Sequence, residues 1–268
     1  MEPDVDWVEP EVGFELTPQT VTVETEHQRE KLALCGLDPD TLGEVADASF
    51  FIRLGILAGV DSGITSEGSI NMVQSLVQYR IIKLDEPLVV KGVIEAVTSV
   101  PRGKTVDTDV WFEDQLGNRV VSARRRSLKP DPSAPSRGAG ERPPPAVDDL
   151  NALTSVGQFA LTPPRVCGYS SEGNSIHYDM ASAQRAGFRA PMIGGGMGVH
   201  YLIDALWKAH RPSAFDLDIF FRRPIFWDDA FDVGITADVD AMCLWRTEAA
   251  GRKVLTEARI NKLTPSDS

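Results

Sequence analysis

The sequence predicts an α+β fold made of two similar halves, each an antiparallel sheet curled around one long helix. Three features indicate this architecture. A segment rich in Pro, Gly, Ser and Ala divides the chain near its middle. Each half carries one strongly apolar helical stretch, and each carries strand-like alternation after a short matching run of sequence.

The dividing segment extends from Lys129 to Asp148 and contains no large aliphatic side chain before Val147. This composition is typical of an extended, mobile linker. We therefore expect a first half at 1–129, a linker at 130–148 and a second half at 149–268. A chain of 268 residues allows each half to bury its own core.

Each half is expected to contain one buried helix, at 49–60 in the first and at 196–210 in the second. Both stretches carry few charges, as expected for a helix that sheet surrounds on most sides. In the second stretch, four apolar residues recur at the spacing of a single helical face. They are Leu202, Ala205, Leu206 and Ala209.

The strands follow the helix in each half. Placing Arg80 on Arg223 relates the two halves, since both runs then show a strand, an acidic turn and a strand. The other matched pairs are Ile82 with Ile225, Asp85 with Asp228, Glu86 with Asp229 and Leu88 with Phe231. Apolar alternation predicts strands at 89–97, 106–112, 120–123, 231–239 and 254–258. An antiparallel sheet around one helix, made twice, is a double hot dog.

The charge balance narrows the possible partners. A formal net charge of −12 argues against nucleic acid or an anionic membrane as the main partner, because both need a broad basic surface. The three cysteines, Cys35, Cys167 and Cys243, are far apart and lack CxxC spacing, so we expect neither a disulfide framework nor a zinc site. The acidic N-terminus is unlike a signal peptide, and no apolar run is long enough for a membrane span. We expect a soluble, cytoplasmic protein.

The chemistry of the chain is concentrated in residues 172–197. Glu172, Asn174 and His177 precede a run of three glycines at 194–196. A carboxylate and an imidazole close together favour general acid/base catalysis. The glycines allow a close approach of backbone to a ligand and open the second predicted helix. The first amides of that helix are a natural oxyanion site, and Gly195, Gly196 and Met197 are its candidate residues.

This stretch resembles the signature of the MaoC-like dehydratases and R-specific enoyl-CoA hydratases. The resemblance is carried by Glu172-x-Asn174-x-x-His177-x-Asp179, then by Ala186-Gly187-Phe188, Pro191 and Gly195-Gly196-Met197. The layout is similar to the two-half branch that includes 3-hydroxyacyl-thioester dehydratases and mesaconyl-CoA hydratases. Three positions differ from the family: Glu172 stands for Asp, Ser175 for Pro, and Gly195 for His.

The resemblance implies a hydro-lyase that adds or removes water across the 2,3 bond of an enoyl-CoA or 3-hydroxyacyl-CoA. Glu172 and His177 would hold the water and Asn174 would orient them, with no cofactor or metal. The first half has no such motif and would shape the acyl pocket. The expected partner is an acyl-CoA, and either a monomer or a homodimer is compatible with two joined halves.

Other interpretations stay open at this point. A hot-dog thioesterase would use Glu172 as base or nucleophile, and a non-catalytic acyl-thioester-binding protein would need neither residue to react. The phosphates of CoA need cations, for which several basic residues are available, although such residues also occur on solvated strand faces. These are Arg102, Lys104, Arg124, Arg125, Arg126, Arg222 and Arg223.

Overall fold

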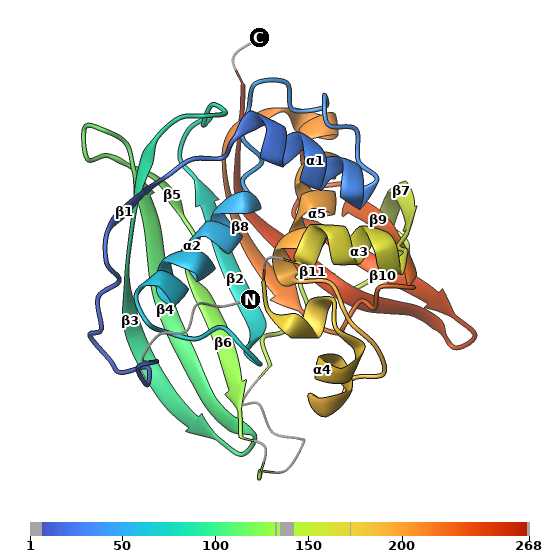
Figure 1. The fold of residues 1–268 in the computed structure, drawn as a ribbon. Helices are drawn as coiled ribbons and strands as arrows, with labels where there is room; N and C mark the ends of the chain where they lie inside the picture. Colours follow the sequence, from blue (N-terminus) through green and yellow to red (C-terminus); the bar gives the residue numbers. More distant parts are fainter. Residues whose placement is uncertain (1–6, 132, 135–141, 172, 267–268) are drawn as a thin grey trace.

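The computed structural model describes residues 7–131, 133–134, 142–171 and 173–266. Within these ranges the strands form one eleven-stranded sheet, and neighbouring strands pair antiparallel. The strand order is β1-β3-β4-β5-β2-β8-β11-β10-β9-β7, and β6 pairs with both β2 and β4. The sheet curls around helix α2 in one half and helix α5 in the other (Figure 1). The predicted double hot dog is confirmed.

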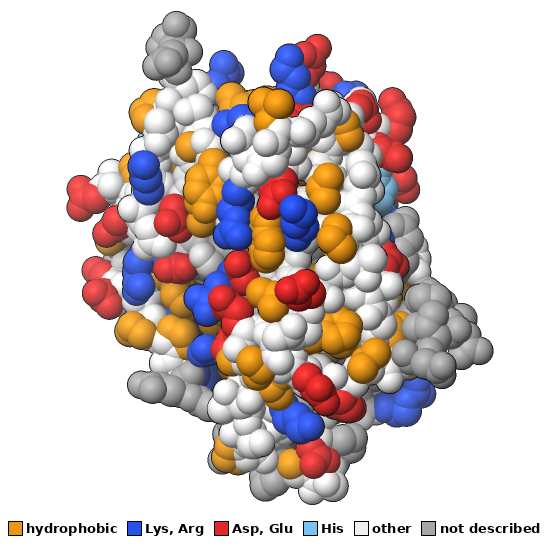
Figure 2. Space-filling model, turned by 90° about the vertical axis from the view of Figure 1, so that its left-hand side faces the viewer, with side chains coloured by type: hydrophobic (Ala, Val, Ile, Leu, Met, Phe, Trp, Pro, Cys, Tyr) orange, Lys and Arg blue, Asp and Glu red, His pale blue; other side chains and the backbone are white. Residues whose placement is uncertain are grey.

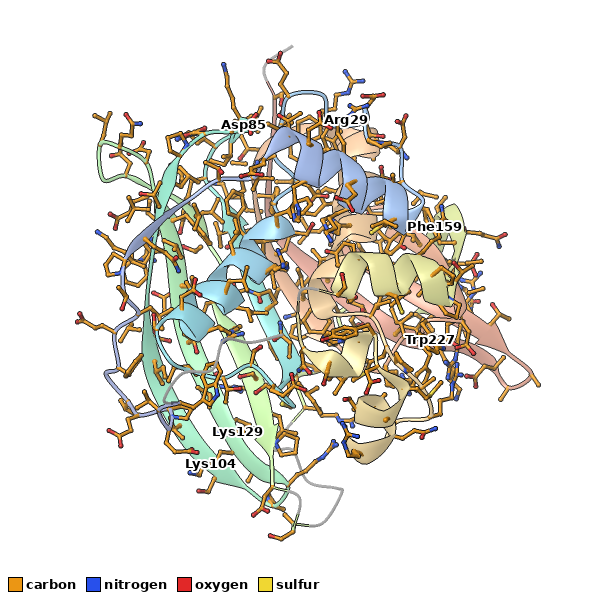
Figure 3. All side chains as sticks on the ribbon, in the orientation of Figure 1. Arg29, Asp85, Lys104, Lys129, Phe159 and Trp227 are labelled. Carbon is orange, nitrogen blue, oxygen red and sulfur yellow. The ribbon has the colours of Figure 1, made fainter. Side chains whose placement is uncertain are left out.

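The first half contains two helices and six strands among the described residues. They are β1 (Gln19–Val21), α1 (Thr25–Cys35), α2 (Phe50–Asp61), β2 (Ile70–Gln78), β3 (Leu88–Val100), β4 (Gly103–Glu113), β5 (Arg119–Ser122) and β6 (Arg125–Pro130). Helix α2 lies across the strands of this half, and its Phe51 ring packs against that of Phe112 on β4, with centroids 4.8 Å apart. Asp85 holds the start of α1 by accepting hydrogen bonds from the backbone and the hydroxyl of Thr25 (Figure 3).

The second half repeats this order with short helices inserted ahead of its central helix. Its elements are η1 (Leu150–Ala152), β7 (Leu153–Ala160), α3 (Pro163–Ser170), η2 (Ser175–His177), α4 (Met180–Arg185), α5 (Gly195–His210), β8 (Pro212–Phe221), β9 (Ala230–Thr236), β10 (Ala241–Glu248) and β11 (Gly251–Pro265). Helix α5 is buried along most of its length. Its Tyr201 ring packs against Phe159 of β7 and Phe231 of β9 (Figure 3).

Strands β2 and β8 join the halves into one continuous sheet, with a register from Val73 opposite Phe220 to Gln78 opposite Phe215. One large hydrophobic core includes side chains of both halves. The two central helices therefore lie inside a shared interior, and a site between them can draw residues from either half.

Equivalent hydrogen bonds confirm the internal repeat. The N–H of Ala46 donates to the carbonyl of Ile82 at 2.9 Å, and the N–H of Ile193 donates to that of Ile225 at 2.9 Å. Ile82 and Ile225 are the pair that the sequence match aligned. The same comparison places Asp47, just ahead of α2, opposite Gly194, just ahead of α5.

One predicted strand is too long. The sequence predicts a strand at 231–239, but β9 ends at Thr236, because residues 237–240 turn back toward β10. The hydroxyl of Thr236 stabilises this turn by accepting hydrogen bonds from the N–H groups of Asp240 and Ala241.

Part of the predicted linker contacts the second half. Arg222 donates hydrogen bonds to the carbonyls of Pro143 and Pro144, so this part of the predicted linker is held against the second half.

In the described ranges, no helix is both long enough and apolar enough to span a membrane.

Candidate active site

His177 ends the short helix η2, and a hydrogen bond fixes its imidazole. Its Nδ1 lies 2.8 Å from the carbonyl oxygen of Met192. Because a carbonyl only accepts, Nδ1 carries the proton and Nε2 is left as an acceptor. Desolvation by burial lowers the pKa of His177 below its usual 6.5, although the bond to Met192 and the charge of Glu67 partly offset it. The ring is therefore neutral, with a basic Nε2.

The free Nε2 faces the start of α5. A Cβ placed on Gly194 would lie 3.5 Å from Nε2, so this glycine leaves the space in front of the nitrogen open. Gly194 precedes α5 in an extended conformation, and no side chain caps the helix. The first backbone bond of α5 runs from the N–H of Gly198 to the carbonyl of Gly194 at 3.3 Å.

Three amides at this helix start are available to a ligand. Among the described residues, no acceptor is bonded to the N–H groups of Gly195, Gly196 or Met197. They lie at the positive end of the helix dipole, which favours negative charge. An unprotonated imidazole nitrogen and a helix start with unpaired amides therefore lie close together.

In the first half, a side chain already occupies the corresponding helix start, that of α2. Asp47 replaces Gly194 there, and its Oδ1 accepts a hydrogen bond of 2.8 Å from the N–H of Ser49. Asp47 is completely buried. Because its carboxylate occupies the start of α2, this end cannot bind a second anion. The asymmetry of the motif in the sequence thus has a counterpart in the helix ends.

Asn174 connects the loop that carries His177 to the first half. Its Nδ2 donates to the carbonyl of Ser66 at 3.0 Å, and its Oδ1 accepts from the N–H of Ile176 at 3.3 Å. The second bond caps η2, which carries His177. Asn174 is buried and positions the loop, so its contacts are to protein in this structure.

Glu67 is the residue that sequence reasoning missed. This exposed side chain, on the loop between α2 and β2, accepts hydrogen bonds from the backbone N–H of Ser175 at 3.3 Å and from the Ser175 hydroxyl. A proline, which the family has at position 175, offers neither donor. The serine at position 175, where the family has proline, could therefore have indicated that another part of the chain contacts this loop. Glu172 lies outside the described residues, so its catalytic role stays a prediction.

Three of the six candidate phosphate-binding arginines form ion pairs with carboxylates. Arg124 pairs with Glu95 at 2.6 Å, Arg126 with Asp107 at 2.7 Å, and Arg222 with Glu257 at 2.6 Å. On the face shown in Figure 2, basic and acidic side chains are interspersed. Lys104 of β4 and Lys129 of β6 lie at one end of the strands of the first half (Figure 3), and both lie near Glu9.

A second histidine lies in a buried network between the halves. His200 of α5 is fully buried, with Nδ1 2.8 Å from Asp47 and Nε2 2.8 Å from the hydroxyl of Tyr169. Ser49 is also hydrogen-bonded to Nδ1. This network gives His200 a structural role. The network ties the start of α2 to α5.

Fold and site together define a double hot dog protein that sets a neutral imidazole against an uncapped helix start. No protein-family model matches the chain. The 3-hydroxyacyl-thioester dehydratase X of Mycobacterium tuberculosis is 25% identical over 181 residues. The aligned region spans 64% of this chain and 61% of that relative, which is less than two thirds of its length.

Solved structures show the same fold. A crystal structure of that relative, HtdX, gives a TM-score of 0.70 at 18% identity and covers 90% of this chain and 97% of its own. A MaoC-like dehydratase from Phytophthora capsici gives 0.68 at 15% identity, with 93% and 95% covered. The sequence relative and the structures of this name support the MaoC-like family that residues 172–197 resemble.

Proposed function

We propose that this protein adds water to, or removes it from, the 2,3 bond of an acyl-CoA thioester. The observation that carries the proposal is the neutral His177, whose Nε2 lies 3.5 Å from the Cβ position of Gly194, the residue that precedes the unpaired amides of α5. The relative named as a 3-hydroxyacyl-thioester dehydratase supports the same reaction class.

In the hydration direction, Nε2 of His177 takes a proton from water as the water oxygen bonds to C3. The electron pair of the C2–C3 double bond moves toward C1, and negative charge develops on the thioester oxygen. The N–H groups of Gly196 or Met197 stabilise that oxygen. A proton then returns to C2 from the carboxylate and imidazole pair, so the product is a 3-hydroxyacyl thioester. Dehydration is the reverse.

The magnitudes are adequate for catalysis without a cofactor. A general acid or base typically contributes about 100-fold to 10,000-fold in rate. One oxyanion-site hydrogen bond contributes about 3 to 4 kcal/mol to the barrier. We propose that Glu172 shares the water with His177 and that the site needs no metal.

The proposal is tested by incubating the protein with crotonyl-CoA and with longer or branched enoyl-CoAs. Absorbance of the conjugated enone and release of free thiol are followed together. We expect loss of absorbance without thiol release. Thiol release would instead indicate a thioesterase, and binding of CoA esters that raises the melting temperature without turnover would indicate a binding protein.

A further inference from the structure

Phe221 is the last residue of β8 and faces the interior of the second half. Side chains alternate between the two faces of a strand, so Phe221 shares a face with Phe215, Leu217 and Ile219. Those three side chains belong to the hydrophobic core and are buried. Phe221 packs against the same core but is partly exposed. The inward-facing row of β8 therefore reaches solvent at its last residue.

The ring of Phe221 lies against the start of α5. A Cβ on Gly195 would lie 2.8 Å from Cζ of Phe221 and 2.9 Å from Cε1, which is closer than the usual contact of about 3.5 Å between carbon atoms. The ring therefore takes the space that any side chain at position 195 would need. Gly195 is one of the three positions at which this chain differs from the motif that it resembles, and the contact gives a physical reason for the glycine.

The three glycines at 194–196 show what surrounds the unpaired amides. A Cβ on Gly194 would lie 3.5 Å from Nε2 of His177, and one on Gly196 would lie 3.8 Å from the carbonyl oxygen of Ser49. Consecutive residues of a helix point in directions about 100° apart, so the imidazole, the aromatic ring and the start of α2 lie on different sides of the helix start. Ser49 is buried, whereas His177 and the three glycines are partly exposed. A ligand can therefore reach the amides between the imidazole and the ring.

A thioester bound to these amides brings its C2 atom close to the ring. Cζ of Phe221 lies within about 7 Å of the amide nitrogen of Gly196, because three covalent bonds separate that nitrogen from the Cβ position of Gly195. A thioester oxygen that accepts a hydrogen bond of about 2.9 Å from this amide leaves C2 about 4 to 5 Å from the nitrogen. Carbon atoms in contact lie about 3.5 to 4.0 Å apart, so the ring is within reach of a group on C2.

We propose that Phe221 determines the specificity of the site at C2, because its ring packs against a C2 that carries hydrogen and leaves no room for a methyl group there. The inference rests on the proposed function and names its substrate class: 2-enoyl thioesters without a branch at C2. The side of Ser49 is closed by backbone, and the side of His177 holds the reacting water. A substituent on C2 therefore has to lie on the side of the ring.

The test compares crotonyl-CoA with 2-methylcrotonyl-CoA in the wild-type protein and in variants at position 221. The ratio of the two kcat/KM values is measured for each protein, so that the intrinsic difference in reactivity cancels between proteins. One methyl group in a closely fitting site changes kcat/KM by about tenfold to 200-fold. We expect Phe221→Ala to raise the ratio of 2-methylcrotonyl-CoA to crotonyl-CoA by that order, and Phe221→Leu to raise it less.

Phe220→Leu is the matched control. Phe220 is the neighbouring aromatic residue on the opposite face of β8, where its ring lies against the guanidinium of Arg222. This variant should keep the wild-type ratio. The Leu variant at position 221 decides the question if the Ala variant folds poorly.

The contact between the ring and the helix start has a separate test. Gly195→Ala should lower the melting temperature of the wild-type protein but not that of Phe221→Ala, in which the space is free. Equal losses in both proteins would contradict the placement of the ring and, with it, the inference.

Several other results would overturn the inference. Unchanged ratios in both Phe221 variants would show that the ring does not contact the substrate, and equal turnover of both substrates by the wild-type protein would contradict the exclusion. If the wild-type protein hydrates neither substrate, the proposed function fails, and calorimetry with butyryl-CoA and 2-methylbutyryl-CoA decides the specificity claim. Tighter binding of butyryl-CoA, with the difference lost in Phe221→Ala, supports it, and equal affinities contradict it.

Discussion

The Nδ1 atom of His177 lies 2.8 Å from the carbonyl oxygen of Met192, and this bond decides which ring nitrogen is free to act as a base. Met192 lies two residues before Gly194, so the segment that orients the imidazole also leads into the unpaired amides of α5. The same few residues thereby position the proposed base and the proposed oxyanion site.

Replacing the imidazole should remove most of the activity. We expect His177→Ala to lower kcat by about 100-fold to 10,000-fold, because the general base is lost. The far-ultraviolet circular dichroism should be unchanged. His210→Ala, at the last residue of α5, is the control and should keep wild-type turnover. Equal rates for the wild-type protein and His177→Ala would remove His177 from the mechanism.

The activity should fall at acid pH. Burial lowers the pKa of His177 below 6.5, so the neutral base persists below that value and is lost as the pH falls through the lowered pKa. The same shift affects stability. The unfolded chain takes up this proton at a higher pH than the folded chain, so the free energy of unfolding decreases as the pH falls below 6.5 toward the lowered pKa. A profile of kcat/KM against pH measures the acid limb, and a midpoint above 6.5 would contradict the burial argument.

A methyl group at position 194 should block the site without unfolding the protein. In Gly194→Ala the new Cβ would lie 3.5 Å from Nε2 of His177, in the space that a reacting water needs. The backbone of Gly194 has φ −67°, which alanine adopts readily. We expect a strong loss of turnover with little change in melting temperature.

Gly198→Ala provides the matched control for that substitution. Its Cβ would meet neighbouring side chains at 3.7 Å or more, inside α5 and away from the imidazole. Alanine is favoured over glycine in a helix by about 1 kcal/mol. This variant should be active and slightly more stable. Full activity in Gly194→Ala would show that the water does not lie in front of Nε2.

Glu67 should act as a positioning residue across the two halves. We expect Glu67→Ala, which removes both bonds, to lower kcat/KM several-fold, and Ser175→Ala, which removes only the hydroxyl bond, to lower it less. The double variant should be no worse than Glu67→Ala, since that change already removes both bonds. Glu67→Gln should also move the acid limb to lower pH, because the charge of Glu67 raises the pKa of His177. A purely structural role would leave that limb unmoved.

The network around His200 should stabilise the fold. Asp47→Ala leaves the buried His200 Nδ1 without its carboxylate and Ser49 N–H without its acceptor. Breaking a buried pair of this kind costs about 3 to 5 kcal/mol. Urea denaturation should show this loss, whereas the exposed Asp148→Ala should unfold like the wild-type protein. A loss below about 1 kcal/mol, the level of a surface ion pair, would contradict this role.

The sequence predicts the architecture well because periodicity and repetition are local signals. The apolar stretches at 49–60 and 196–210 become α2 and α5, and the match of Ile82 to Ile225 reappears as equivalent hydrogen bonds. The strand at 231–239 is predicted too long because Thr236 ends it through a turn made by its own hydroxyl.

The site is only partly predictable for a physical reason. His177 and the glycines belong to one stretch of sequence, 172–197, and the structure places Gly194 next to the imidazole. Glu67 and Asp47 belong to the other half, and their contacts span more than a hundred residues of chain. In the sequence, Arg125 is indistinguishable from its neighbours Arg124 and Arg126. Only the register of β6 shows that it faces inward.

The central claim is that His177 activates a water molecule for addition to C3 of an enoyl thioester bound at the start of α5. It is tested most directly by incubating the wild-type protein and His177→Ala with an enoyl-CoA in oxygen-18-labelled water and locating the label by mass spectrometry. We predict that the wild-type protein places the label on C3 of a 3-hydroxyacyl thioester and that His177→Ala gives no label above background. Label in a free carboxylic acid, or equal labelling of C3 by both proteins, would contradict the claim.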